Sequence, residues 1–474
     1  MVNTDLAPEL PAGLDWLNAA KGSLHEQRGR IVALAFVNAA SVWCSQRLAE
    51  LAVLQARHLG KLKVLVLNVP RFDSERDGTR ALKRLRRHGT SLPVLHDADW
   101  AAWQRYGVEV WPTVLLIDGE GHVRHRLAGL DAAGDLERLT MALCDGLGFP
   151  PDDDMHSMRE ANPEPRLPLR FPTGLCATAD RLYVADTGHN RILECTHGGR
   201  VLRQFGMPSA DLVDGEGTLA AFNRPHGLAL VRESLYVADT GNHALRRIHL
   251  GSGVVDTLVG HGKPGDPFDG IVAVSRDVPL CHPMALAEAN NRIFIAQAGD
   301  NRIWSYDLGS RQLVSVAGSG QLEVRDGGGL MAAFAQPVSL AAVHQMLYVC
   351  DALGSAVRSV QPRTGVVQTL VGQGPWQFGD DDGPRDTARL QHPQAIALSP
   401  DAPQLWIADS GNCALRMLRL GGGELTTPSL PRPLQGPAGL AVAAGAVWIA
   451  ETDAHAVVRY DIASGELGHV PIDE

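Results

Sequence analysis

LYVADTGHNRIL, at residues 182–193, is the stretch that decides the fold of most of this chain. A close counterpart, LYVADTGNHALRRI, follows at residues 235–248. Four weaker versions come after it, so the stretch recurs six times between residue 171 and the end of the sequence. Each copy follows an anchoring proline: Pro172, Pro225, Pro283, Pro337, Pro393 and Pro437. Self-similarity at intervals of 44 to 58 residues is typical of a repeat architecture.

Each copy reads as four short strands. An apolar run follows the proline, then a Leu-Tyr-Val-Ala run, a turn, an Arg-Ile or Arg-Arg-Ile run and a valine-rich run. We expect the turn carboxylate, Asp186 in the first copy, to accept backbone N–H groups, and Gly188 to adopt a positive φ. A single four-stranded sheet of this kind cannot bury both of its faces. Six copies therefore predict a closed six-bladed β-propeller.

These repeats resemble NHL repeats over roughly residues 165–474. Three copies depart from the Asp-x-Gly turn: the third has Gln297, the sixth has Glu451, and the fourth reads Ala352-Leu353-Gly354. We interpret them as weaker versions of the same turn. Asp-Gly pairs also lie ahead of four blades, at Asp214-Gly215, Asp269-Gly270, Asp326-Gly327 and Asp382-Gly383. We interpret these as ordinary turns, and the alternative is a set of long loops that form a surface on one face.

The first third of the chain alternates strand and helix signals. Strands are predicted at residues 31–38 and 62–69, helices at 44–58, 79–88 and 135–147, and a hairpin within 106–130. This order resembles the thioredoxin fold, as does Trp111-Pro112-Thr113 ahead of an apolar strand. The resemblance implies that Pro112 follows a cis peptide bond and lies beside the redox site.

The segment after the first strand reads Ser41-Val42-Trp43-Cys44 where thioredoxin-like proteins have Cys-x-x-Cys. In this register Ser41 replaces the nucleophilic cysteine; a competing register pairs Cys44 with Arg47 instead. Dithiol exchange needs an attacking thiolate and a resolving thiol, and one of the two is missing in either register. We expect Ser41 to be a helix N-cap. Cys44, Ser41 and Pro112 are the candidate catalytic residues, although a buried, inert Cys44 thiol is the preferred interpretation.

Both parts and their order resemble the NHL repeat-containing protein 2 family. The resemblance also covers GLDWLN near residue 13, VWPT at 110 and VAGSG at 316. It implies a multidomain protein: an α/β thioredoxin-like domain at 1–148, a linker at 149–166 and an all-β, six-bladed NHL propeller at 167–474. It further implies a cytosolic protein with suspected thiol redox activity. Members carry a Cys-x-x-Cys in the first domain, which this chain lacks, and some have a further C-terminal β-domain.

The candidate binding residues fall into two groups. Trp43, Trp111 and Thr113 flank the degenerate redox motif, where an extended peptide would bind. Thr173, His226 and Gln394 each follow an anchoring proline and are expected to face the propeller axis. The corresponding residues of the other blades are Met284, Val338 and Ala438. One imidazole among six such positions does not make a metal site, so no metal and no cofactor are expected.

Composition narrows the functional classes. The net charge of −10 disfavours nucleic acid as a partner. We expect no secretory signal and no membrane-spanning run. Seven dispersed cysteines suggest reduced thiols in the cytoplasm. Three functions stay open: a protein-binding or scaffold protein, a single-thiol oxidoreductase or peroxide-linked redox protein that uses Cys44, and a metal-dependent propeller hydrolase. We favour the first, with a protein or peptide partner and an oligomeric state left open.

Overall fold

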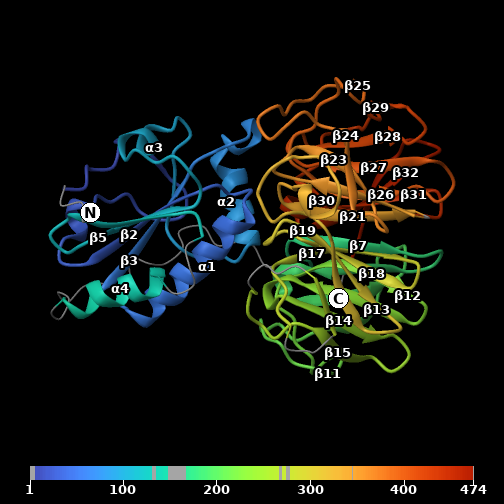
Figure 1. Cartoon of the computed structure of the whole chain (residues 1–474), viewed down its shortest axis with the longest axis horizontal. Coiled ribbons are helices and arrows are strands. Elements are labelled where there is room, and N and C mark those ends of the chain that lie inside the picture. Colours follow the sequence, from blue (N-terminus) through green and yellow to red (C-terminus); the bar gives the residue numbers. More distant parts are fainter. Residues whose placement is uncertain are drawn as a thin grey trace. The chain divides into compact units, whose positions relative to one another are not determined.

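The computed structural model describes residues 6–130, 135–147, 167–265, 270–273, 278–343 and 345–472. The chain divides into two units, Met1–Pro165 and Arg166–Glu474, and each is described by itself (Figure 1). The linker predicted at residues 149–166 lies outside the described residues. An N-terminal α/β thioredoxin-like unit and a β-propeller are both present, as the repeats and the strand–helix pattern predict.

The first unit is built on one mixed sheet with the strand order β1-β4-β3-β2-β5-β6. Its strands are β1 (Asp15–Trp16), β2 (Ile31–Val37), β3 (Leu62–Asn68), β4 (Val94–His96), β5 (Thr113–Ile117) and β6 (Val123–Ala128). Its helices are α1 (Val42–Arg57), α2 (Gly78–Arg87), α3 (Ala101–Arg105), α4 (Asp135–Asp145) and the 3₁₀ turns η1 (His25–Gln27) and η2 (Asp73–Glu75). The predicted elements are confirmed to within about two residues at each end, and the short β1, β4 and α3 were not predicted.

The sheet is buried on both faces, which explains why β2 reads as a continuous apolar run. Ala33 and Ala35 face one core, which includes side chains of α1, α2 and α4. Leu34 and Phe36 face the other core, where Trp103 of α3 packs. Figure 1 shows α3 on one side of the sheet and α1 and α4 on the other. Strand alternation thus supplies two cores from a single strand.

The second unit contains six antiparallel sheets within its described residues. Blade 1 comprises β7 (Pro172–Ala177), β8 (Leu182–Asp186), β9 (Arg191–Cys195) and β10 (Val201–Phe205). Blade 2 comprises β11 (Gly215–Glu216), β12 (Pro225–Val231), β13 (Ser234–Asp239), β14 (Ala244–His249) and β15 (Val254–Val259). Blade 3 comprises β16 (Ile271–Ala273), β17 (Pro283–Ala289), β18 (Arg292–Gln297), β19 (Arg302–Asp307) and β20 (Gln312–Ala317).

The remaining three blades follow the same antiparallel order. Blade 4 comprises β21 (Pro337–Val343), β22 (Met346–Asp351), β23 (Ala356–Gln361) and β24 (Val366–Val371). Blade 5 comprises β25 (Gly383–Pro384), β26 (Pro393–Leu398), β27 (Gln404–Asp409), β28 (Ala414–Arg419) and β29 (Glu424–Thr426). Blade 6 comprises β30 (Pro437–Ala443), β31 (Ala446–Glu451), β32 (Ala456–Asp461) and β33 (Leu467–Val470). The 3₁₀ turns are η4 (Thr187–His189), η5 (Thr240–Asn242), η6 (Gly329–Met331) and η7 (Thr452–Ala454).

The strand after each anchoring proline is the innermost strand of its blade, and these six strands contact one another in a closed ring. Turn residues join each blade to the next. The Thr187 hydroxyl of blade 1 donates to Pro225 O of blade 2 over 2.7 Å. The ring closes between blades 6 and 1, where Thr452 Oγ1 donates to Pro172 O over 2.6 Å and Phe171 N–H donates to His455 Nδ1 over 3.0 Å.

The turn after the second strand confirms one part of the prediction and contradicts another. As predicted, the Asp186 carboxylate accepts a backbone N–H, which is that of Arg170 at the start of its own blade and not one of the turn. The positive φ belongs to Asn190 at the end of the turn, and Gly188 has none. Gly188 is instead required by proximity, since its N–H donates to Arg170 O and an added Cβ would lie 2.7 Å from that oxygen. The turn therefore fastens two strands of the blade together.

Adding a methyl group to the same glycine in blade 5 should strain the propeller. In a Gly411→Ala variant the Cβ would lie 2.4 Å from Gln391 O, which is buried backbone. We expect a loss of about 1–3 kcal/mol in the free energy of unfolding. Urea denaturation followed by circular dichroism measures it. Gly421→Ala is the matched control, because nothing lies within 4 Å of an added Cβ there; equal stability of the two variants would contradict this account.

The Asp-Gly segments are not ordinary turns, so the preferred interpretation was wrong. Described segments of this group pair with the outermost strand of the blade that they precede. In blade 2, β11 begins at Gly215 and pairs with β15; in blade 5, β25 begins at Gly383 and pairs with β29. In blade 4 the pairing is a bridge between Gly327 and Val367. Blade 3 gains β16 in the same way, next to Gly270, although Asp269 lies outside the described residues.

A buried arginine holds each Asp-Gly segment in blades 2, 4 and 5. In blade 2 the Arg246 guanidinium is fully buried and donates to Asp239 Oδ2 over 2.8 Å and to Asp214 Oδ1 over 3.0 Å. The Asp214 carboxylate also accepts from Thr257 Oγ1 of β15. The matching sets in the other two blades are Asp351, Arg358, Asp326 and Thr369, and Asp409, Arg416, Asp382 and Thr427.

Candidate functional site

Helix α1 begins immediately after Ser41, the residue that stands in the place of the missing cysteine. Its hydroxyl accepts the backbone N–H of Cys44 over 3.4 Å, so Ser41 is the N-cap that the sequence predicts. Its side chain therefore has a structural role in the first turn of the helix, where backbone N–H groups lack intrahelical partners.

The Cys44 thiol is fully buried. Its sulfur accepts the backbone N–H of Asn38 over 3.3 Å. Burial raises the pKa of the thiol to about 12, because it outweighs the lowering effects of Asn38, Ser41 and Arg47; the charge of Glu75 makes a small contribution in the same direction as burial. A thiol with this pKa is protonated at neutral pH, and the thiolate is the species that attacks disulfides. The burial predicted for the Cys44 thiol is therefore confirmed.

A buried carboxylate lies behind the loop that joins β2 to α1, and the sequence analysis did not identify it. Glu75 is fully buried. Its carboxylate accepts from Asn38 Nδ2 over 2.7 Å, from Arg84 Nη1 over 3.2 Å, and from the backbone N–H groups of Arg71 and Phe72. Asn38 thus links this carboxylate to the Cys44 sulfur through its side chain and its backbone. No sequence signal marks Glu75 as a link to the candidate site, because its bond to Asn38 joins residues 37 positions apart along the chain.

Trp111-Pro112 is the second part of the candidate site. The peptide bond between them is cis, as the resemblance to thioredoxin-like proteins implies. The Pro112 carbonyl accepts the N–H of Gly129 over 2.7 Å, and Thr113 Oγ1 donates to Val110 O over 2.8 Å. Pro112 and Thr113 are buried, Trp111 is half-buried and the Val110 side chain is 46% exposed. This segment therefore presents Val110 and part of Trp111 to solvent.

Aromatic side chains hold the Trp111 ring. Its centroid lies 4.6 Å from that of Trp103 and 5.3 Å from that of Trp100. Trp43, at the start of α1, is half-buried. The predicted pair of Trp43 and Trp111 thus offers apolar surface at the ends of two different elements. The contribution of Trp100 and Trp103 was not predicted, because the short helix α3 that carries Trp103 gave no periodic signal.

Arg47, the second position in the competing register, is a structural residue. It is only 4% exposed. Its guanidinium donates to Glu50 Oε2 over 2.9 Å and to Gly129 O over 3.2 Å. Gly129 also binds the Pro112 carbonyl, so Arg47 ties α1 to the end of β6 close to the cis peptide bond.

The three candidate residues of the propeller lie on innermost strands, and all three are buried. The Thr173 hydroxyl lies 2.6 Å from the Thr187 hydroxyl, which itself donates to the next blade. Gln394 Nε2 lies 3.2 Å from His392 Nε2. His226 O lies against Gly174 of the neighbouring strand. These contacts describe blade packing, and they belong to a different unit from Trp43, Trp111 and Thr113.

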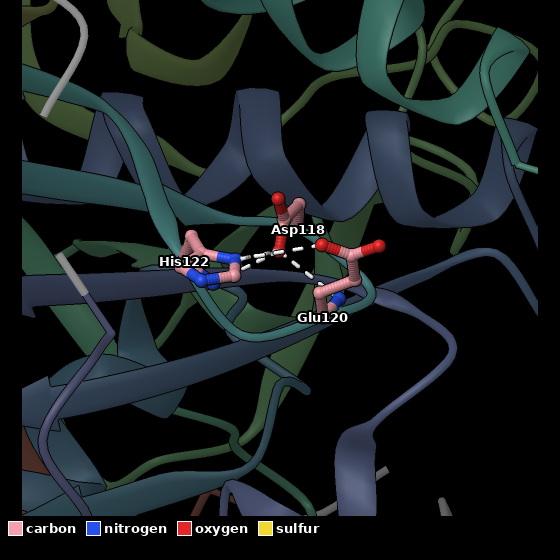
Figure 2. A group of neighbouring side chains, drawn as sticks. All are labelled: Asp118, Glu120 and His122. Atoms are coloured by element: carbon pink, nitrogen blue, oxygen red, sulfur yellow. Dashed lines mark hydrogen bonds and ion pairs between the residues drawn. The ribbon is translucent and has the colours of Figure 1, made fainter. Parts of the chain in front are cut away.

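Among the described residues, one group of three could present ligand atoms to a metal ion: Asp118, Glu120 and His122 (Figure 2). They lie in the turn between β5 and β6. Asp118 Oδ1 accepts the N–H groups of Glu120 and His122, and Oδ2 accepts from Arg124. Burial raises the pKa of Asp118, but these bonds outweigh it and hold that pKa below its usual value. The carboxylate is thus committed to the turn, and we assign no metal here.

In the described part of the chain, no helix is long and apolar enough to cross a membrane. All seven cysteines are free thiols.

Comparisons with known proteins support both units. The AhpC/TSA family model matches residues 7–126, and the NHL repeat model matches residues 169–195 and 222–248. NHL repeat-containing protein 2 of Bos taurus is 30% identical over 87% of this chain and 62% of its own length. The Homo sapiens protein of that name is 28% identical over 98% of this chain and 71% of its own length.

Arabidopsis thaliana provides a further relative, named Protein SUPPRESSOR OF QUENCHING 1, chloroplastic. It is 30% identical over 97% of this chain but only 47% of its own length. The chain therefore spans about half to two thirds of the length of the bovine and Arabidopsis proteins.

Proposed function

The chain is a relative of the NHL repeat-containing protein 2 family over nearly its whole length, and from that premise we propose that it is a protein-binding protein whose thioredoxin-like unit recognises partners without dithiol chemistry. One observation carries the proposal. The only cysteine in the degenerate motif is fully buried, protonated at neutral pH and preceded by a serine that caps the helix. A single-thiol mechanism would need that sulfur to reach a substrate.

The side chains around the degenerate redox motif favour recognition of a peptide segment of a partner protein. Val110 and parts of Trp43 and Trp111 provide apolar surface, and the Trp111 ring is held by two other tryptophans. Rigid aromatic side chains bind with a small loss of conformational entropy, which suits them to protein recognition. We propose an extended peptide segment of a partner protein as the ligand. The seven free thiols fit the cytoplasmic location that we also propose.

Thiol chemistry is the decisive test of this proposal. We expect the purified full chain to reduce a disulfide substrate such as insulin no faster than a Cys44→Ser variant does. We also expect iodoacetamide at pH 8 to alkylate Cys44 in the folded protein at less than about a tenth of its rate in urea, because burial raises the thiol pKa to about 12.

Peptide mapping by mass spectrometry separates Cys44 from the other six cysteines. Of these, Cys176 is half-buried and serves as the internal comparison for accessibility. Turnover that disappears in the Cys44→Ser variant would overturn the proposal and restore the single-thiol oxidoreductase.

A further inference from the structure

The outer edge of blade 6 differs from those of blades 2 to 5. In these four blades the segment that leads into the blade pairs with the blade's own outermost strand. The corresponding segment of blade 6, residues 427–436, forms no such pairing with β33 in the part of the chain that the structure describes. The outermost strand of blade 6 therefore lacks the cover that its counterparts have.

The sequence of this segment explains the difference. It reads TPSLPRPLQG, with Pro428, Pro431 and Pro433, and it contains no Asp-Gly pair. Proline has no N–H to donate to a strand. The segment is also far shorter than residues 206–224, which lead into blade 2 and include β11.

The backbone of β33 is oriented to receive another strand. The hairpin before it is fixed by a hydrogen bond from Asp461 N–H to Glu466 O over 2.9 Å. Backbone groups in an antiparallel strand alternate in direction, so Glu466 and Gly468 direct theirs toward β32. Leu467 and His469 consequently direct their N–H and C=O groups to the open side. Unpaired groups of this kind are a template for strand addition.

A groove of about 680 Å³ runs along this edge. Ser429, Leu430 and Pro431 line it from the segment that leads into blade 6, and His197 and Gly198 line it from blade 1. Arg459 and residues 465–471 complete the lining. Blade 6 lies between blade 5 and blade 1 in the ring, and residues of β33, of blade 1 and of the segment that leads into blade 6 line the same groove.

The charge of the lining indicates the chemistry of the occupant. The lining contains three basic residues, Arg459, His197 and His469, and one acidic residue, Glu466. Arg459 is 39% exposed and pairs with Asp461 over 2.9 Å through one of its nitrogens, and His469 is exposed. In blade 6, His469 of the outermost strand pairs with Val458. In blade 2, Thr257 of the outermost strand pairs with Arg246 at the same position of the blade, so His469 occupies the place of Thr257. Thr257 there binds the carboxylate of the added segment, Asp214. Blade 6 thus presents an imidazole where a sibling blade binds an acid.

We propose that the open edge of β33 binds an extended, acidic segment of a partner protein as an added antiparallel strand. The groups that would hold it are the backbone of Leu467 and His469, with the side chains of His469 and Arg459 on its carboxylates. The four sibling blades supply the precedent within the same molecule, since each outer strand there is paired with an extended segment. This surface belongs to the propeller and is separate from the site around Cys44 and Trp111.

The test uses the full chain and a fluorescein-labelled, end-blocked peptide with the sequence DLVDGEGT, which copies residues 211–218. We expect saturable binding in fluorescence anisotropy at pH 6.5 and low salt, weakened by added salt. A His469→Pro variant removes one outward N–H from an edge position, where proline is tolerated. It should weaken binding about fivefold or more, the effect of one or more lost hydrogen bonds.

His469→Ala is the matched control, because it retains the backbone N–H and should retain more affinity than His469→Pro. His469→Asp changes only an exposed side chain and should weaken binding by repulsion, so it gives a result even if the proline variant is unstable. The peptide NLVNGQGT, without acidic side chains, should bind more weakly than DLVDGEGT. Absence of saturable binding up to about 1 mM, or equal affinity of the wild type, His469→Pro and His469→Asp, would overturn the proposal.

Discussion

A Ser41→Cys variant, which restores the Cys-x-x-Cys motif that the chain lacks, is expected to show disulfide chemistry at this site. Ser41 occupies the N-cap of α1, and its hydroxyl lies 3.4 Å from the N–H of Cys44. A hydrogen bond from its side chain already lowers the pKa of the Cys44 thiol, so a sulfur at this place lies within reach of Cys44. It would also lie at the positive end of the helix, which favours the thiolate. We expect a reversible disulfide and insulin reduction at least about tenfold above wild type.

Mass spectrometry of the oxidised protein would detect the disulfide, and titration against a dithiothreitol buffer would give its potential. Ser41→Ala controls for loss of the N-cap, which should cost about 0.5–2 kcal/mol in either variant. The double variant Ser41→Cys/Cys44→Ser should show no reductase activity, because it lacks a resolving thiol. If the Ser41→Cys variant folds yet forms no disulfide, the register that places Ser41 at the nucleophile position is wrong.

Removal of Arg246 is expected to destabilise the propeller more than any surface substitution. Arg246 and Asp239 are both fully buried, and their ion pair spans 2.8 Å. An Arg246→Ala variant would leave the Asp239 carboxylate buried without its cation and release Asp214. Loss of one partner from a buried pair costs about 3–5 kcal/mol. Urea denaturation of the full chain, followed by far-ultraviolet circular dichroism, should show this loss.

The neighbouring residue provides the matched control. Arg247 pairs with Asp256 over 2.6 Å, but the two side chains are 28% and 33% exposed. An Arg247→Ala variant should therefore lose only about 0–1 kcal/mol. Similar losses in the Arg246→Ala and Arg247→Ala variants would contradict the role assigned to the buried cluster.

The loss in the Arg246→Ala variant should also depend on pH. Burial raises the pKa of Asp239 to about 6, and Arg246 is the largest effect that lowers it. Without Arg246 the folded state retains the Asp239 proton to a higher pH, whereas the unfolded state releases it near pH 4. The folded state then binds more protons than the unfolded state, so stability falls as pH rises. The variant should thus lose more stability than wild type between pH 5 and pH 8.

Local and periodic features of the sequence were sufficient for the two folds. The six copies after the anchoring prolines predict a propeller because a repeated four-stranded unit has to stack in order to bury its faces. The apolar runs at 31–38 and 62–69 predict a buried sheet, because a strand that is covered on both faces has apolar residues at successive positions. Ser41 as N-cap follows from its position ahead of α1, and the cis bond at Pro112 from the resemblance to thioredoxin-like proteins.

Features that depend on contacts between distant segments could not be read in this way. In the sequence, the Asp-Gly pairs look like turns. In the structure, Arg246 and its counterparts bind the Asp residues, and the segments that contain them pair with the outermost strands. Glu75 gave no signal, since Asn38 and Arg84 reach it only in the folded unit. The open edge of β33 likewise becomes evident only by comparison with blades 2 to 5, whose outermost strands are paired with an added segment.

The propeller and the thioredoxin-like unit were thus determined by the sequence itself, because repetition and hydrophobic alternation are properties of neighbouring residues. The state of Cys44 was decided only by the tertiary structure. Its spacing from Ser41 is that of a redox motif, and the helix start would favour a thiolate. Burial in the core between the sheet and α1, with Glu75 nearby, raises its pKa to about 12 instead. Desolvation depends on every atom that surrounds the sulfur, and only the folded chain assembles those atoms.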